Sequence, residues 1–185
     1  FVSKAISRYF ATLDPILQSN FDLIKPKTFT GDFEVEIGFV ISDKSSGMII
    51  LSGGTGENGF EIYKNSSGTF SIFREGVSLG GTFLNYADGV FRKLRVKRTG
   101  TTASVFIDKN HINTITLSGP CTIRKFGHRY ESAFYTKGYL ISPKLTDLSG
   151  AEPVTETYTL GNAPVDTFYK YGDELWGNAP TSMSA

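Results

Sequence analysis

Hydrophobic and polar residues alternate over ten residues, from Asp32 to Ile41. The hydrophobic members of this stretch are Phe33, Val35, Ile37, Phe39 and Ile41. A period of two is typical of a β-strand that has one face in a core and the other face polar. We therefore expect this stretch to form a half-buried strand.

Two later segments show the same alternation. In residues 91–98, Leu94 and Val96 alternate with a basic row, and residues 102–108 follow after a short turn. The members of the basic row are Lys93, Arg95 and Lys97. Two alternating segments joined by a short polar turn indicate a β-hairpin.

Further short apolar or alternating segments are separated by turn residues, and they predict more strands. These segments are 21–24, 48–51, 60–63, 69–73, 77–84, 111–117, 121–126 and 139–148. Residues 52–59 are predicted to form a flexible loop that ends in an Asn-Gly turn. Pro26 is expected to break the first strand, and Pro143 predicts an edge or a bulge in the last one. About ten or eleven short strands predict an all-β fold, a two-sheet antiparallel jelly-roll sandwich.

The two ends of the chain differ from this pattern. An apolar stripe over residues 1–20 predicts a short amphipathic helix that ends near Asp14 and Pro15. Its members are Val2, Ala5, Ile6, Tyr9, Phe10 and Leu13. Residues 151–185 contain proline and aromatic residues but little periodicity. We interpret 21–150 as the jelly-roll domain and 151–185 as an irregular tail that wraps this domain or a neighbouring subunit.

The composition argues against nucleic-acid binding and membrane insertion, and it limits how the fold can be stabilised. The formal charge is +1, so the chain has no basic field of the kind that nucleic-acid binding requires. No apolar run approaches the roughly 18 residues of a membrane span, so membrane insertion is not expected. Cys121 is the single cysteine, so the fold must form without an intrachain disulfide.

Four segments, in this order along the chain, resemble the laminin-G-like, concanavalin A-like family. They are GDFEVEIGF (31–39), GFEIYKNSSGTFSI (59–72), DGVFRKLRVKRTGTTASVFID (88–108) and FYTKGYLISPKLTDLSG (134–150). Two positions depart from the family pattern, because Phe91-Arg92 stands where a Trp-His pair is common and Asp108-Lys109 replaces an Asp-Gly turn. The resemblance is strongest to such domains in phage tail-fibre or other virion proteins.

Three carboxylates share one face of the central strand, namely Asp32, Glu34 and Glu36. Such a row resembles the catalytic strand of laminarinase-like glycoside hydrolases, and a spacing of about 6.6 Å suits a pair of carboxylates. The other interpretation is a solvated face whose charges pair with the basic row of a neighbouring strand. We favour the second interpretation and expect no enzymatic activity and no catalytic residues.

Metal binding has little support in the sequence. His111 and His128 are the two histidines, and neither has a second ligand at zinc spacing. Oxygen ligands for a structural calcium ion would have to come from residues in turns, namely Asp43, Glu57, Asn58, Asp88 and Asp108. Asp and Asn are also common turn residues, so we expect no cofactor and no metal site.

Residues 127–135 are the best candidate for ligand binding. This predicted loop combines donors, acceptors and aromatic rings, which suit carbohydrate recognition. The candidate carbohydrate-binding residues are His128, Arg129, Tyr130, Phe134 and Tyr135. The alternative is that its aromatic side chains close the end of the sandwich or pack against a neighbouring subunit.

We therefore predict a non-enzymatic phage virion protein, a tail-fibre or surface component assembled in the host cytoplasm. Its expected partners are other virion subunits, in a homo-oligomer, and a cell-surface glycan. Two alternatives remain open at this point: a secreted carbohydrate-binding module and a glycoside hydrolase of the laminarinase-like type.

Overall fold

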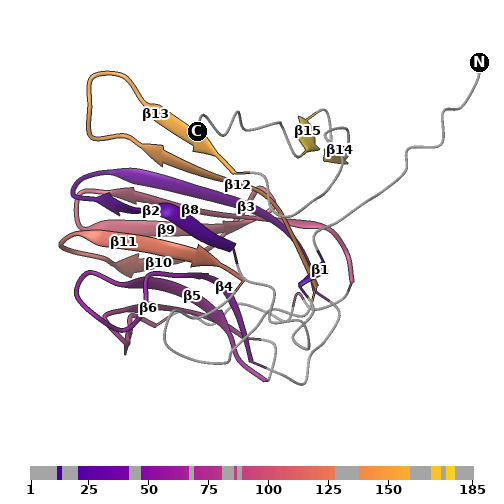
Figure 1. The fold of residues 1–185 in the computed structure, drawn as a ribbon, viewed down its shortest axis with the longest axis horizontal. Helices are drawn as coiled ribbons and strands as arrows, with labels where there is room; N and C mark the ends of the chain where they lie inside the picture. The colour runs from indigo at the N-terminus through magenta and orange to yellow at the C-terminus, as the bar shows by residue number, and fades with distance from the viewer. Residues whose placement is uncertain are drawn as a thin grey trace, which may run out of the picture.

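The fold is seen in a computed structural model. It describes residues 12–13, 21–41, 47–66, 69–80, 86, 89–127, 138–158, 168–171 and 174–177. All regular elements in these ranges are β-strands (Figure 1). No helix in this part of the chain is long and apolar enough to cross a membrane.

Seven strands form the first sheet, called sheet A. Their order is β1 (Thr12–Leu13), β12 (Gly138–Asp147), β3 (Phe33–Ile41), β8 (Arg92–Thr99), β9 (Thr102–Ile107) and β10 (Asn110–Thr116), and β13 (Val154–Thr157) also pairs with β12. Each strand pair is antiparallel. The strand with the clearest alternation, β3, therefore lies in the middle of the sheet.

Six strands form the second sheet, called sheet B. Their order is β2 (Phe21–Phe29), β11 (Cys121–Phe126), β4 (Met48–Ser52), β5 (Phe60–Lys64), β6 (Phe70–Arg74) and β7 (Val77–Ser78). A separate two-stranded sheet joins β14 (Phe168–Tyr171) and β15 (Glu174–Gly177). The predicted all-β, two-sheet antiparallel sandwich is confirmed.

Both ends of the chain contain strands that the hydrophobic pattern did not predict. The expected helix falls on residues 1–20, of which the structure describes Thr12 and Leu13, and these two form β1 and pair with the start of β12. The rest of that helix lies outside the described residues. In the tail, which was expected to be irregular, β13 pairs with β12 and extends sheet A.

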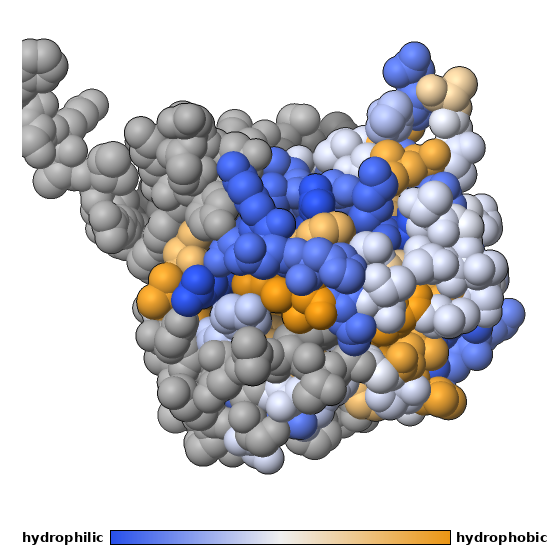
Figure 2. All heavy atoms as spheres, turned by 180° about the vertical axis from the view of Figure 1, so that it is seen from behind, coloured by the Kyte–Doolittle hydropathy of each residue, from blue (hydrophilic) through white to orange (hydrophobic). Residues whose placement is uncertain are grey.

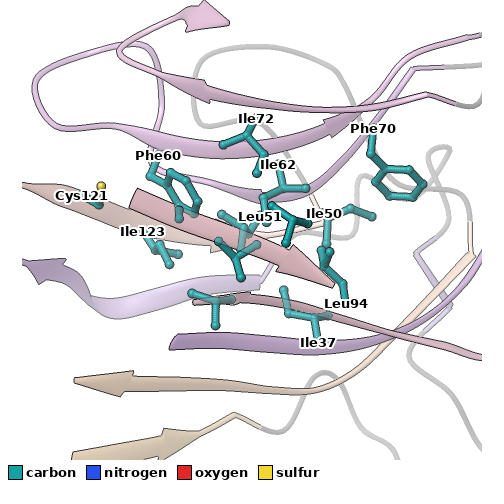
Figure 3. Close-up of a cluster of buried hydrophobic side chains, with 14 of the residues drawn as sticks. Ile37, Ile50, Leu51, Phe60, Ile62, Phe70, Ile72, Leu94, Cys121 and Ile123 are labelled. Carbon is teal, nitrogen blue, oxygen red and sulfur yellow. The ribbon is translucent and has the colours of Figure 1, made fainter. Parts of the chain in front are cut away.

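The core lies between the two sheets (Figure 3). The alternating hydrophobic side chains of β3 are fully buried and face those of sheet B. The ring of Phe33 stacks on Phe29 at a centroid distance of 4.6 Å and meets Phe60 edge-on at 5.8 Å. Each side chain of this size stabilises the fold by about 1.5–3 kcal/mol on burial, so the core is the main source of stability.

Two prolines lie inside strands at irregular positions. Pro26 does not break β2, because β2 is an edge strand of sheet B and Pro26 lies where its register with β11 shifts, between Asp22 and Lys27. Pro143 lies in the interior strand β12, and the register with β3 shifts between Ile141 and Lys144. Of the two predictions for Pro143, an edge or a bulge, the bulge is confirmed.

The loop of residues 53–59 is compact. The N–H of Gly53 donates to the Phe60 carbonyl at 2.8 Å, and the N–H of Thr122 donates to the Asn58 carbonyl at 2.6 Å. A Cβ atom at Gly53 would overlap the Thr122 carbonyl oxygen, which explains the glycine at that position. The sequence predicted a flexible loop here, but close backbone contacts fasten this one to β11.

Two polar clamps link the sheets at different places. In the arginine clamp, the buried Arg98 side chain of β8 donates to the carbonyls of Gly100 at 2.8 Å and Gly119 at 2.5 Å, just before β11. In the carboxylate clamp, Lys27 of β2 meets Glu156 of β13 at 2.5 Å, and the Tyr158 hydroxyl also donates to Glu156. Each clamp ties an element of sheet A to one of sheet B.

Candidate functional site

The structure fixes the two ends of the predicted carbohydrate-binding loop. The candidate residues His128, Arg129, Tyr130, Phe134 and Tyr135 all lie outside the described residues. Before them, the Gly127 N–H donates to the Ile50 carbonyl of sheet B at 3.0 Å. After them, Gly138 pairs with Ile41 of sheet A. The chain therefore leaves sheet B at Gly127 and enters sheet A at Gly138, at the end of the sandwich where β3 ends.

Other segments reach the same end of the sandwich, which we call the rim. The rim comprises Ile41, Tyr86, residues 89–93, residues 108–109 and the two loop ends, Gly127 and Gly138. The Gly89 N–H donates to the Ile41 carbonyl at 2.9 Å, and the Asp108 N–H donates to the Lys93 carbonyl at 2.7 Å. These bonds place the start of β8 and the β9–β10 turn beside the base of the predicted loop.

Three side chains of the rim form a polar and aromatic cluster. Arg92 Nη1 donates to Asp108 Oδ2 at 3.1 Å, and the Lys93 N–H donates to Asp108 Oδ1 at 3.0 Å. The Arg92 guanidinium lies 5.5 Å from the centre of the Tyr86 ring. The cluster offers donors, a carboxylate and an aromatic ring, which are the groups that hold the hydroxyls and C–H faces of a sugar.

Sequence reasoning missed two members of this cluster. Arg92 was noted as a departure from the family's Trp-His pair, and Tyr86 was not singled out. Asp108, with φ of 59°, forms the tight turn that aims its carboxylate back at the start of β8. The sequence contained a sign of this ion pair. Arg92 begins a hairpin and Asp108 ends it, so a basic and an acidic residue come to the same end of the two strands.

The turn residues considered for calcium do not come together among those described. Glu57 and Asn58 lie in the β4–β5 loop, at the opposite end of the strands from Asp108. In the described part of the chain, no three His, Cys, Asp or Glu side chains are grouped as metal ligands would be. Asp43 and Asp88 lie outside the described residues.

The acidic row of β3 lies beside the basic row of β8, as the charge pattern predicts. Glu34 is opposite Lys97 and Glu36 is opposite Arg95, while Glu36 forms an ion pair with Lys93 at 2.6 Å. Burial raises the pKa of Glu34, and the nearby Glu36 raises it further. This face is therefore a mixed-charge surface.

The third carboxylate has a structural role. Asp32 accepts a hydrogen bond of 2.7 Å from the Gly100 N–H and so fastens the β8–β9 turn. Because Asp32 is held at this turn and Glu36 is held by Lys93, the row is arranged differently from two carboxylates that flank a bound sugar.

Histidine and cysteine lie on different sheets. His111 is on β10, where its ring meets Phe106 edge-on at 5.3 Å and its Nε2 lies 2.9 Å from Thr114 Oγ1. Cys121 is buried on β11, and burial raises the pKa of its thiol. The two side chains are therefore not arranged as a nucleophile and a base. His128 lies outside the described residues.

Comparisons with known proteins address the fold. No family model matches the chain, and no curated protein sequence matches it. Among solved structures, domains 4 and 5 of the mouse laminin α1 chain superpose with a TM-score of 0.61 at 13% identity, covering 92% of this chain and 47% of that one. A heptameric pentraxin of Limulus polyphemus gives 0.50 at 9% identity, over 68% of each chain.

A phage protein is among the similar structures. Tailspike protein 2 of an Escherichia coli O157:H7 bacteriophage superposes with a TM-score of 0.57 at 12% identity, covering 75% of this chain and 22% of that one. The present chain thus spans under half of the laminin chain and about a fifth of the tailspike. The chain has the laminin-G-like jelly-roll fold that its motifs predicted.

Proposed function

We propose that this chain is a non-enzymatic domain of a bacteriophage virion protein, a tail-fibre or spike component, and that it attaches to a host-surface glycan through the rim. The observation that carries this proposal is the cluster of Arg92, Asp108 and Tyr86 at the base of the loop that contains the candidate residues. Carbohydrate sites combine hydrogen-bonding groups with a flat ring in this way.

The tailspike supports the phage assignment, because a jelly roll of the same kind occurs in a protein of that class. Virion components of this kind work as assemblies, so other virion subunits and further copies of this chain are the proposed protein partners. Calcium has no part in the proposal, since in the described part of the chain Asp108 belongs to no group of three acidic, His or Cys side chains that could hold a metal ion.

A glycan array that includes polysaccharides of bacterial surfaces tests the proposal. We expect binding to a defined glycan, and we expect Arg92→Gln and Tyr130→Ala each to weaken it at least about tenfold, the loss expected for about 1.4 kcal/mol of contact energy. Glu57→Gln is the matched control, because Glu57 is exposed and lies at the opposite end of the strands.

Two outcomes would contradict the proposal. The first is binding that all three variants retain, because the rim would then not be the site. The second is release of reducing sugar from the bound glycan that stops in Glu34→Gln, because this would make the acidic row catalytic and the protein a glycoside hydrolase.

A further inference from the structure

The outer face of sheet A carries two rows of side chains that cross the strands. The strand registers define the rows, each read in the order β13, β12, β3, β8, β9 and β10. The first row is Thr157, Lys144, Glu36, Arg95, Phe106 and His111. The second row is Thr155, Thr146, Glu34, Lys97, Ser104 and Thr114. Hydrophilic residues form a band across this face, with hydrophobic residues beside it (Figure 2).

Three charged side chains at the centre of this face have no ion pair within the described part of the chain. Glu34 and Lys97 are direct cross-strand neighbours, but their side chains make neither a hydrogen bond nor an ion pair there. Arg95 holds its guanidinium 4.1 Å above the centre of the Phe106 ring, and its Nε has no hydrogen-bond partner. These charges are ordered on the sheet and still able to meet a partner.

The acidic and basic rows lie on two adjacent strands near the middle of the face. A two-fold axis that runs along the strands, above the sheet and midway between β3 and β8, exchanges the positions of these two strands. It would place the acidic strand of one copy directly over the basic strand of another. A patch that is complementary to itself under such an axis is the requirement for an isologous dimer.

We propose that the outer face of sheet A binds a second copy of this chain in a two-fold arrangement. Glu34 of each copy then faces Lys97 of the other, and Glu36 faces Arg95. The symmetry makes each of these contacts twice, so four charge pairs lie at the centre of the interface. The central position matters because twisted sheets approach each other most closely near the axis.

Most flanking positions agree with the same axis. Thr146 faces Ser104, Thr155 faces Thr114, and Thr157 faces His111, so hydroxyls meet hydrogen-bonding groups. The row that contains Glu34 and Lys97 brings no two like charges together. Lys144 of one copy lies over Phe106 of the other, beside the Arg95 guanidinium that already covers this ring, and Glu36, the neighbour of Lys144 in its own copy, faces the same guanidinium.

The size of the face suits a stable dimer. Six strands about 4.8 Å apart span about 24 Å, and strands of four to ten residues at about 3.3 Å each span about 24 Å on average. The product is about 600 Å² for each copy, so two copies together bury about 1,200 Å², the lower end of the range for specific interfaces.

Light scattering combined with a charge-swap experiment tests the proposal. At about 100 μM, where a micromolar dimer is mostly formed, we expect the chain to have twice its mass of 20.3 kDa. Glu34→Lys and Lys97→Glu should each be monomeric under these conditions, since each places like charges opposite one another. An equimolar mixture of the two variants should form a dimer again, because each of the two facing positions then joins a lysine of the first variant to a glutamate of the second.

Controls separate the interface from general charge effects and from misfolding. Glu152→Lys and Lys109→Glu change exposed charges outside the two rows and should leave the dimer mass unchanged. The milder Glu34→Gln and Lys97→Gln should raise the dimer Kd about three- to tenfold if the reversed variants fail to fold. A monomeric wild type, or reversed variants that stay dimeric, or a mixture that stays monomeric, would each overturn the proposal.

Discussion

The arginine clamp and the carboxylate clamp both link sheet A to sheet B, but they use different chemical groups. The arginine clamp is a buried guanidinium that donates to two backbone carbonyls, Gly100 and Gly119. The carboxylate clamp is an ion pair between Lys27 and Glu156, with Tyr158 as a further donor, and the Glu156 side chain is 44% exposed.

The two clamps differ in how their contribution to stability depends on pH. A guanidinium stays charged at all accessible pH values, and carbonyls do not titrate, so the arginine clamp does not depend on pH. The carboxylate clamp requires an ionised Glu156. We therefore expect the arginine clamp to make a constant contribution to stability and the carboxylate clamp to weaken in acid.

The largest expected effect comes from the arginine clamp. Arg98→Ala should lower the free energy of unfolding by about 3 kcal/mol, because it removes two hydrogen bonds donated by a charged group together with the packing of a buried side chain. Urea denaturation followed by tryptophan fluorescence or circular dichroism measures this change. Thr99→Ala, at the exposed neighbouring position, is the control and should change stability by less than about 0.5 kcal/mol.

The carboxylate clamp should give a smaller effect that depends on pH. Burial opposes ionisation of Glu156, but the hydrogen bonds from Lys27 and Tyr158 outweigh it, and its pKa is lowered. A lowered pKa in the folded state gives stability that is present above the ordinary glutamate pKa and lost as the pH falls through the folded value. Glu156→Gln should therefore cost about 1 kcal/mol at neutral pH and nothing in acid.

The measurement is a series of urea titrations between neutral and acidic pH, with exposed Glu152→Gln as the control. If the cost of Glu156→Gln stayed constant across this range, the clamp would not depend on the charge of Glu156.

Tyr158 allows a second test of the carboxylate clamp, at alkaline pH. Burial and the neighbouring Glu156 raise the pKa of this phenol, so its protonated form is favoured in the folded state. The stability that it contributes is present below the ordinary tyrosine pKa and is lost as the pH rises towards the folded value. Relative to Tyr158→Phe, the wild type should lose stability in this alkaline range, and thermal unfolding at several pH values measures the loss.

The smallest expected effect is at Glu34. Because its pKa is raised, ionisation of Glu34 works against folding as the pH rises through the ordinary glutamate pKa towards the raised value. Glu34→Gln should therefore leave the stability at neutral pH unchanged or raise it by less than about 0.5 kcal/mol. A clear loss of stability in monomeric protein would show that Glu34 has a favourable partner within its own chain.

Strict alternation made much of the fold predictable. The period-two pattern of β3, β8 and β9 corresponds to an inner face that is buried, and the charge rows of β3 and β8 are neighbours as the sequence suggested. Strands without this pattern were missed, because β13 is exposed at its first residues and gains its place from pairing with β12.

The candidate site was predicted less completely. The residues predicted to form the loop, Tyr130 among them, lie outside the described residues, and the clustering of Arg92 with Asp108 depends on a turn that reverses the chain between β9 and β10. Contacts of this kind join residues that are distant in the sequence and have no periodicity. The same holds for the carboxylate clamp, where Lys27 and Glu156 are 129 residues apart.

The bulge at Ser142 and Pro143 sets which side of β12 faces inward. One extra residue lies between Ile141, opposite Gly38, and Lys144, opposite Glu36, so Leu145 points into the core and Lys144 points out. The carbonyl of Pro143 also accepts the Tyr158 N–H at 2.8 Å. In evolutionary terms, β12 should tolerate the loss of one codon at this bulge far better than elsewhere along the strand. A deletion here leaves Lys144 opposite Glu36 and Leu145 opposite Val35, whereas a deletion in the regular part of the strand would exchange its inner and outer faces.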